Sequence, residues 1–212
     1  QKLEMDRRFL RRRIHLLTEK LEQLEKGMLE RRKKRRKQQK SVAIIGYTNA
    51  GKSSLLNVLT HEDVLVEDQL FATLDTTSRR LWLAGEKGEV QIVLTDTVGF
   101  IQDLPHTLVE SFQSTLLETV DTDLLLHVVN SAHPGYLQQV ETVQETLKEI
   151  NAENIPQILC FNKIDLLSTE TYLQLRREFP KAYFISTRTK ENLSLLREAL
   201  YNFFIKKRPE NS

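Results

Sequence analysis

The stretch that decides the fold is residues 41–54, which read SVAIIGYTNAGKSS. The β-branched run ends at Gly46 and the apolar segment LLNVL follows the loop, so the order strand, loop, helix is predicted. The spacing G-x-x-x-x-G-K-S is typical of a phosphate-binding loop, in which backbone N–H groups and the positive end of the helix hold phosphate oxygens. We expect Lys52 to reach the β- and γ-phosphates and Ser53 to ligate Mg²⁺.

A second phosphate element follows the apolar run EVQIVLT, which predicts a buried strand ending at Asp96-Thr97-Val98-Gly99. Asp96 can hold the water shell of Mg²⁺, and Gly99 can offer a backbone N–H group to the γ-phosphate. Alone, this D-x-x-G pattern has low specificity. Its position at the end of a predicted strand is what indicates a phosphate-binding role.

Two further strand ends predict base recognition. The strand in IPQILCFNKID ends in Asn162-Lys163-Ile164-Asp165, where the Asp165 carboxylate can accept hydrogen bonds from guanine N1–H and its exocyclic amine. Adenine lacks this donor pair, and a buried carboxylate left unpaired costs roughly 1–3 kcal/mol or more, so such a site discriminates between bases. The strand AYFI leads into Ser186-Thr187-Arg188, whose backbone N–H groups are expected to support the base.

The four elements in this order predict a guanine-nucleotide-binding domain of the α/β class. We expect a mostly parallel doubly wound sheet with the ligand at the strand carboxyl ends. RRLWLAG and GEVQIVLT predict a hairpin around residues 85–88, and DLLLHVVN predicts a central strand in which His127 is a core histidine. Helices are expected at about 107–120, 134–151, 169–178 and 190–207.

Charge divides the chain. Residues 1–40 carry 16 Lys and Arg against 6 Asp and Glu, a net +10, whereas the remainder carries 15 against 23, a net −8. We therefore expect a basic helical arm at 1–40, a nucleotide-binding domain at 41–207 and a tail at 208–212. The arm has a heptad-like apolar stripe that needs a partner helix, which indicates the remnant of a helical hairpin: Leu3, Leu10, Ile14, Leu17, Leu21, Leu24 and Met28.

The end of this arm, RRKKRRKQQK at residues 31–40, has eight cations and no acid. Contact with RNA phosphates is the favoured interpretation, with a solvated linker, an anionic membrane surface or a nuclear-targeting signal as alternatives. A single cysteine, Cys160 in an apolar run, indicates a buried thiol in a reducing, cytoplasmic setting. No apolar run approaches the ~18–20 residues of a membrane span. The start at Gln1, already within a helical pattern, suggests a missing upstream region.

At this point the sequence resembles the HflX family of ribosome-associated GTPases, in the Obg-HflX superfamily of the TRAFAC class. The resemblance rests on the phosphate loop 46–53, on DQLFATLD at residues 68–75, on DTVGFIQDLPH at residues 96–106 and on LEMDRR at residues 3–8. It covers nearly the whole chain. The sequence departs from the family pattern at Thr76, where Pro is frequent, and at Thr187, where Ala is usual.

The resemblance implies a GTP- and GDP-binding monomer that contacts the large ribosomal subunit and its rRNA and splits or rescues ribosomes. It implies Mg²⁺ held by Ser53 and Thr73. The implied nucleotide contacts are Gly46, Tyr47, Thr48, Asn49, Ala50, Gly51, Lys52, Ser53, Phe71, Ala72, Thr73, Leu74, Asp75, Asp96, Thr97, Val98, Gly99, Asn162, Lys163, Ile164, Asp165, Ser186, Thr187 and Arg188. A glycine-rich domain that family members carry upstream is essentially absent from the sequence.

The catalytic group is left unassigned. Phe100 follows Gly99 where Ras-type GTPases place a Gln that orients the attacking water, so we expect slow hydrolysis without ribosomes. His106 is a candidate, but a structural or partner-contact role is the favoured interpretation. Arg79 and Arg80 are interpreted as a surface pair rather than as arginine fingers. A non-catalytic, nucleotide-gated RNA-binding or assembly scaffold is the alternative function. A kinase is less favoured because it has no use for the guanine-recognition motif at 162–165.

Overall fold

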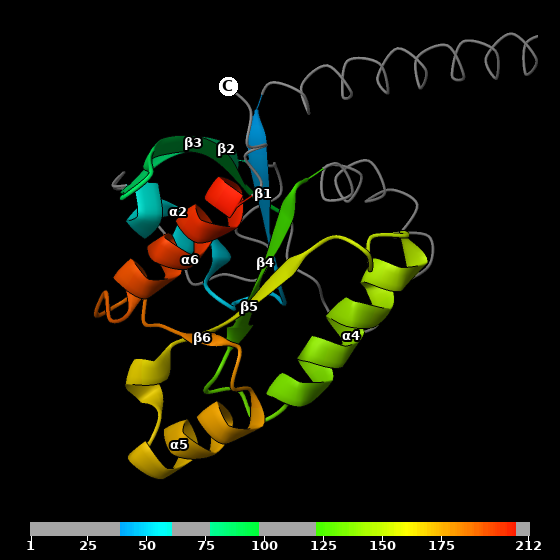
Figure 1. Ribbon diagram of the computed structural model, residues 1–212. Helices are drawn as coiled ribbons and strands as arrows, with labels where there is room; N and C mark the ends of the chain where they lie inside the picture. Colours follow the sequence, from blue (N-terminus) through cyan, green and yellow to red (C-terminus); the bar gives the residue numbers. More distant parts are fainter. Residues whose placement is uncertain (1–38, 61–76, 98–121, 207–212) are drawn as a thin grey trace, which may run out of the picture. The chain divides into compact units, whose positions relative to one another are not determined.

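The computed structural model describes residues 39–60, 77–97 and 122–206 (Figure 1). The chain divides into two units, residues 1–38 and residues 39–212, and every described residue belongs to the second. The predicted basic helix and the predicted helix at 107–120 lie outside the described residues.

One twisted six-stranded sheet organises the described part of the chain. Its strand order is β2-β3-β1-β4-β5-β6, so that β1 and β4 lie at the centre. All neighbours are parallel except β2 and β3, which form an antiparallel hairpin. The strands are β1 (Lys40–Ile45), β2 (Thr77–Gly85), β3 (Gly88–Asp96), β4 (Leu124–Asn130), β5 (Gln157–Asn162) and β6 (Tyr183–Phe184). The predicted mostly parallel α/β sheet is thus confirmed.

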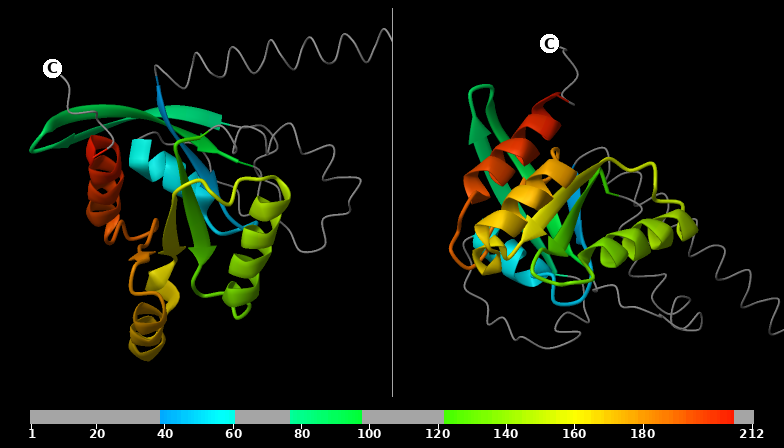
Figure 2. Two further views of the ribbon diagram at one scale, coloured as in Figure 1. Left: turned by 45° about the vertical axis from the view of Figure 1, so that its right-hand side comes forward. Right: turned by 90° about the horizontal axis from the view of Figure 1, so that it is seen from below.

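Helices cover both faces of the sheet (Figures 1 and 2). Buried residues of α2 and α6 pack against one face, whereas α4 and α5 contribute to two clusters on the other. The helices are α2 (Lys52–Thr60), α4 (Tyr136–Glu149), the short 3₁₀ helix η1 (Ile164–Leu166), α5 (Thr169–Glu178) and α6 (Leu193–Lys206). The alternation along β4 explains this division, because Leu124, Leu126 and Val128 point to one face and Leu125 and Val129 to the other.

Element boundaries differ from expectation for physical reasons. The strand β2 begins at Thr77, two residues before the predicted start at Arg79, because its antiparallel pairing with β3 continues from Gly85 opposite Gly88 to Thr77 opposite Asp96. The helix α6 begins at Leu193 and not near residue 190. Lys190 and Asn192 have φ values of +64° and +57°, which a right-handed helix does not accept.

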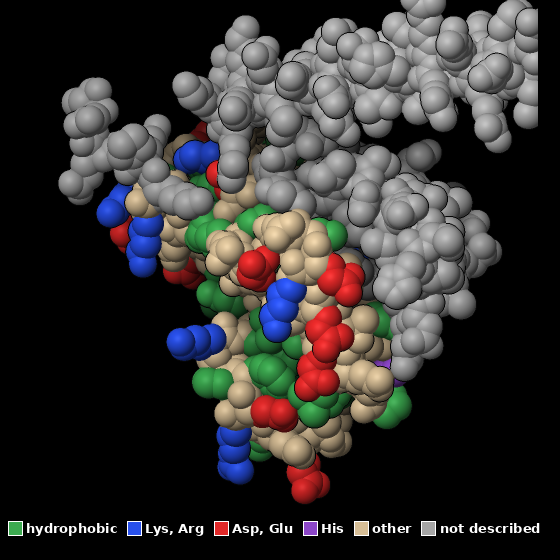
Figure 3. Space-filling view, turned by 90° about the vertical axis from the view of Figure 1, so that its right-hand side faces the viewer, with side chains coloured by type: hydrophobic (Ala, Val, Ile, Leu, Met, Phe, Trp, Pro, Cys, Tyr) green, Lys and Arg blue, Asp and Glu red, His purple; other side chains and the backbone are tan. Residues whose placement is uncertain are grey.

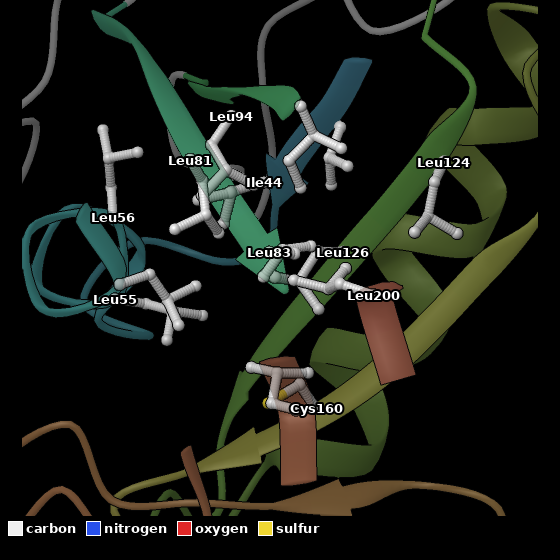
Figure 4. Packing of buried hydrophobic residues seen from close by; sticks show 14 of the residues in the cluster. Ile44, Leu55, Leu56, Leu81, Leu83, Leu94, Leu124, Leu126, Cys160 and Leu200 are labelled. Atoms are coloured by element: carbon white, nitrogen blue, oxygen red, sulfur yellow. The ribbon is translucent and has the colours of Figure 1, made fainter. Parts of the chain in front are cut away.

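The larger core lies between the sheet and the pair α2 and α6 (Figure 4). Ile44, Leu126 and Leu94 come from three adjacent strands, and Leu55 and Leu200 from the two helices; all five are fully buried. Truncating one of these leucines to alanine typically costs about 2–5 kcal/mol. This core fixes the amino end of α2, and therefore the phosphate loop, against the sheet.

The side on which α4 lies is acidic (Figure 3). Glu141, Glu145 and Glu149 recur every fourth residue along α4, and all three are exposed. The described residues contain no helix with both the length and the apolarity to cross a membrane.

Candidate functional site

The phosphate loop connects β1 to α2, and two of its glycines are required by its geometry. Gly46 has φ +146°, and a Cβ atom there would collide with the backbone carbonyl of Val128 on the adjacent strand. Gly51 has φ +91°, and a Cβ atom there would collide with the Asn162 side chain. Because L residues rarely adopt these angles and the neighbouring atoms are close, only glycine fits at either position.

Lys52, the first residue of α2, is a buried cation. Only 7% of its surface is exposed, and Nζ donates a hydrogen bond to the Tyr47 carbonyl at 3.2 Å. Burial lowers the pKa of Lys52 to about 8, and the nearby Asp96 carboxylate partly opposes this effect. A buried ammonium whose pKa is lowered is stabilised by an anion, so the loop is built to receive phosphate.

Ser53 and Asp96 lie side by side next to Lys52. Ser53 Oγ donates a hydrogen bond to Asp96 Oδ2 at 2.6 Å, which brings the start of α2 to the end of β3. The following residue, Thr97, fixes this strand end because its Oγ1 donates to the Ile44 carbonyl at 2.7 Å. A hydroxyl and a carboxylate oxygen beside a phosphate loop form a donor set that fits Mg²⁺.

Asn162, at the end of β5, joins the base-recognition elements to the phosphate loop. Its Nδ2 donates to the Ala50 carbonyl at 3.0 Å, and its Oδ1 accepts from the Thr187 backbone N–H at 3.0 Å. The side chain is fully buried, so these bonds satisfy polar atoms that water does not reach. Asn162 therefore holds three loops in one arrangement.

Lys163 makes the second link to the phosphate loop. Its backbone has φ +67°, and its Nζ donates to Asn49 Oδ1 at 3.1 Å. Asn49 itself has φ +60°. The Lys163 side chain thus reaches from the end of β5 to the phosphate loop.

Asp165 is oriented by the Ser186 hydroxyl, which donates to Asp165 Oδ1 at 2.6 Å and accepts from the Thr189 N–H at 3.0 Å. The sequence pattern predicts that residues 186–188 support the base through their backbone N–H groups. In the structure, the N–H of Ser186 donates to the Glu191 carbonyl at 3.2 Å and that of Thr187 to Asn162. Ser186 thus acts on Asp165 through its side chain, which the motif pattern did not predict.

Ser131 is a supporting residue that sequence reasoning missed. It is buried immediately after β4, and both its N–H and its Oγ donate to the Asn162 carbonyl, at 3.0 and 2.7 Å. A polar residue directly after the central strand DLLLHVVN was the available signal, since carboxyl ends of adjacent parallel strands meet at one edge of the sheet.

His127 and Cys160 lie in the core, as predicted. His127 is 1% exposed, and its pKa is lowered to about 4, first by burial and then by the charge of Lys52. Cys160 is fully buried, and burial raises the pKa of its thiol. Neither group is assigned chemistry at the site.

The structure brings together 46–53, Asp96, Thr97, 162–165 and 186–188. Arg79 and Arg80 lie on β2, half-buried and exposed respectively. Several predicted site residues lie outside the described residues, namely Phe71, Ala72, Thr73, Leu74, Asp75, Val98, Gly99, Phe100 and His106.

Comparison with known families and proteins agrees with this geometry. A family model described as "50S ribosome-binding GTPase" matches residues 41–163. A GTPase HflX from Caldanaerobacter subterraneus subsp. tengcongensis is 52% identical over 167 residues, which cover 78% of this chain and 38% of that protein. The GTPase HflX of Escherichia coli is 49% identical over 166 residues, with the same coverage of each chain.

A further relative and a solved structure extend the match. The GTPase HflX of Gluconacetobacter diazotrophicus is 45% identical over 202 residues, covering 95% of this chain and 44% of that protein. The crystal structure of a GTP-binding protein from Sulfolobus solfataricus in complex with GDP gives a TM-score of 0.63 at 28% identity, covering 92% of this chain and 58% of that one. The chain spans about two fifths of the length of these HflX relatives. With a matching family model, a matching fold and a phosphate loop linked to a guanine-recognition motif, the chain belongs to the 50S ribosome-binding GTPase family and, within it, to the HflX GTPases.

Proposed function

We propose that this chain is a guanine-nucleotide-operated switch that hydrolyses GTP and that, within the whole protein, controls association with the large ribosomal subunit. The observation that carries the nucleotide part is the pair of direct links between the base end and the phosphate end, from Asn162 to Ala50 and from Lys163 to Asn49. These links hold both ends of one nucleotide site in a fixed relation.

At the phosphate end, backbone N–H groups of residues 46–53 and the amino end of α2 bind phosphate oxygens, and Lys52 neutralises their charge. Ser53 would hold Mg²⁺ directly, Asp96 through its water shell, and Thr73 is the proposed ligand from the segment between α2 and β2. When bound, Mg²⁺ neutralises charge on the β- and γ-phosphates. Ser53 and Asp96 support this assignment by their 2.6 Å contact.

At the base end, Asp165 accepts hydrogen bonds from guanine, and Ser186 orients the carboxylate. Replacing Asp165→Asn turns an acceptor into a donor, so preference should shift from GTP toward xanthosine triphosphate, whose carbonyl accepts from the new amide. Competition between the two nucleotides measures this change. An unaltered preference for GTP in the variant would contradict the proposed contact between Asp165 and the guanine base.

For hydrolysis, we propose a slow intrinsic rate that the ribosome raises, because Phe100 offers neither a donor nor an acceptor to the attacking water. The family's description as ribosome-binding supports the ribosomal part of the proposal. The basic segment at residues 31–40 also supports it, because this segment would release counterions on meeting rRNA phosphates. Peripheral contact with a membrane is not part of the proposal.

The test is GTP turnover by the full-length protein with and without purified large subunits, at two salt concentrations. We expect stimulation at least tenfold above the intrinsic rate, weakening at high salt. GTP-dependent subunit binding with no gain in turnover would instead support the alternative, a non-catalytic scaffold. Neither binding nor stimulation would refute the ribosomal part while leaving guanine-nucleotide binding intact.

A further inference from the structure

Arg197, on α6, connects α2, which carries Ser53, to β2, the hairpin partner of the strand that ends at Asp96. Its guanidinium donates to the Leu59 carbonyl through Nη1 at 2.8 Å and to the Trp82 carbonyl through Nη2 at 3.0 Å. Leu59 lies in the last turn of α2, and Trp82 lies in the middle of β2. One side chain therefore ties the far end of α2 to the sheet.

Both contacts have a clear physical reason. The last carbonyls of a helix lack partners within the helix, and they attract a cation. The last turn of α2 contains no basic residue of its own. Arg197 supplies that cation from another helix, and its fork of N–H groups reaches a second carbonyl that a single-point donor could not hold at the same time.

The two tied elements lead directly to the site. At its other end α2, which has nine residues in all, begins with Lys52 and Ser53. β2 pairs with β3 along its whole length, and Thr77 lies opposite Asp96. The hydrogen bond between Ser53 and Asp96 thus joins the start of α2 to the end of β3. Arg197 joins the other end of α2 to β2, the hairpin partner of β3.

We propose that Arg197 is a positioning residue, which holds α2 against β2 so that Ser53 and Asp96 keep the separation that binding of Mg²⁺ with the nucleotide requires. This inference rests on the proposed function, because it concerns the same site. It predicts an effect on the metal dependence of nucleotide binding in particular. A residue that only stabilised the fold would not change that dependence selectively.

The test compares Arg197→Met with a matched control, Tyr201→Phe, in the full chain. The Tyr201 hydroxyl accepts from the Lys87 N–H at 2.9 Å, so it holds α6 to the tip of the β2–β3 hairpin and does not reach α2 through this bond. Affinities for fluorescent GDP and for a fluorescent non-hydrolysable GTP analogue are measured across a MgCl₂ titration and in EDTA.

For Arg197→Met we expect the Mg²⁺ concentration for half-maximal binding of the GTP analogue to rise about three- to tenfold. This is less than is typical for a residue that contacts a metal ligand directly, because Arg197 acts on Ser53 and Asp96 through α2 and the β2–β3 hairpin. Affinity for GDP in EDTA should change less than twofold. Tyr201→Phe should leave the metal dependence within twofold of wild type. Arg197→Lys, whose ammonium keeps the charge, should fall between wild type and Arg197→Met.

Equal Mg²⁺ dependence in wild type and Arg197→Met, or a parallel loss of affinity in EDTA, would overturn the assignment. If Arg197→Met does not fold, Arg197→Lys carries the test, and an unchanged half-saturation in that variant has the same meaning. Failure of the proposed function looks different, because wild-type protein would then show no guanine-nucleotide binding at all.

Discussion

The two ends of the nucleotide site are built in opposite ways. The phosphate end contains a buried cation, Lys52, whose pKa is lowered to about 8 by the cost of burial. The base end consists of neutral and charged groups that already satisfy one another, with Asn162 and Asp165 both hydrogen-bonded. In the free protein, the phosphate end therefore carries the energetic cost of a buried charge. The base end is already held in place by its own hydrogen bonds.

This difference has a thermodynamic meaning. Burying a charge without a full partner lowers the stability of the free protein, and the arriving phosphate removes that cost. Satisfied hydrogen bonds add to the stability of the free protein and also reduce the ordering cost of binding. Mutations at the two ends should therefore change stability in opposite directions while both weaken binding.

The largest effect is expected for Lys52→Met. Removing the cation that faces the phosphates should weaken GTP binding about 100- to 1000-fold, the range for loss of one partner of a buried charge pair. The nucleotide-free protein should become more stable, by about 1–3 kcal/mol, because the buried charge is gone. Nucleotide titration and urea unfolding measure the two quantities.

The control for this variant is Lys148→Met, which removes an exposed lysine on α4. It should change stability by less than about 0.5 kcal/mol and leave binding unaltered. A Lys52→Met protein less stable than wild type would contradict the idea that the free phosphate loop carries an electrostatic cost.

The second-largest effect is expected for Asn162→Ala, which should lower both the stability of the free protein and its affinity for the nucleotide. The substitution leaves the Ala50 carbonyl and the Thr187 N–H without their partner in a buried place, which costs about 2–4 kcal/mol of stability. Guanine-nucleotide affinity should drop about 10- to 100-fold. The exposed Asn154→Ala is the matched control, and a destabilisation equal to that control would show that the three loops are not held by Asn162.

The dependence of nucleotide affinity and of stability on pH should show the electrostatic cost of the phosphate end without any mutation. Nucleotide phosphate raises the pKa of Lys52, so above about pH 8 binding must take up a proton, and affinity should fall about fivefold between pH 8 and 9. The stability penalty of the charged Lys52 is complete below about pH 8 and is relieved as pH rises toward 10.5, so the free protein gains stability from this group in that window.

Calorimetry at pH 8.5 in buffers of different ionisation enthalpy measures the proton uptake directly. At pH 6.5 Lys52 is protonated in both states and contributes no uptake, which provides the internal control. Binding at pH 8.5 with no proton uptake would show that the free loop does not lower the pKa of Lys52.

The smallest effect is expected for Ser186→Ala. The hydroxyl orients Asp165, and its loss removes one hydrogen bond to the carboxylate and one from Thr189, so GTP affinity should fall about 3- to 10-fold. Preference for guanine over adenine should weaken with it. Ser194→Ala, on the exposed side of α6, serves as the control. If Ser186→Ala and Ser194→Ala bound GTP with equal affinity, the Ser186 hydroxyl would not be the group that orients Asp165.

Most of the fold was predictable because its signals are local. The run SVAIIG followed by YTNAGKSS is compatible with one order of elements, strand, loop and helix. The run DLLLHVVN, apolar except for His127 and its two polar ends, forms the central strand that was predicted. The start of α6 was not predictable from composition, because it depends on positive φ angles at Lys190 and Asn192 that helix propensity does not report.

The candidate site was predictable as a set of motifs but not as a connected structure. The residue types at 46–53 and 162–165 indicate phosphate and guanine binding, whereas the links from Asn162 to Ala50 and from Lys163 to Asn49 depend on how the strand order places these loops together. The part played by Ser131 appears only when β4 and β5 are neighbours. Side-chain roles that cross between strands require the register.

The buried Cys160 has a practical consequence for experiments on this chain. It is the single cysteine of the sequence, it is fully enclosed, and its raised pKa keeps the thiol protonated. Maleimide dyes react with thiolates at accessible positions, so they should leave the native folded protein unlabelled. Cysteines introduced at exposed positions such as Glu86 and Glu141 could then carry a donor and acceptor pair, and distances across the molecule could be followed during a nucleotide cycle without altering its interior.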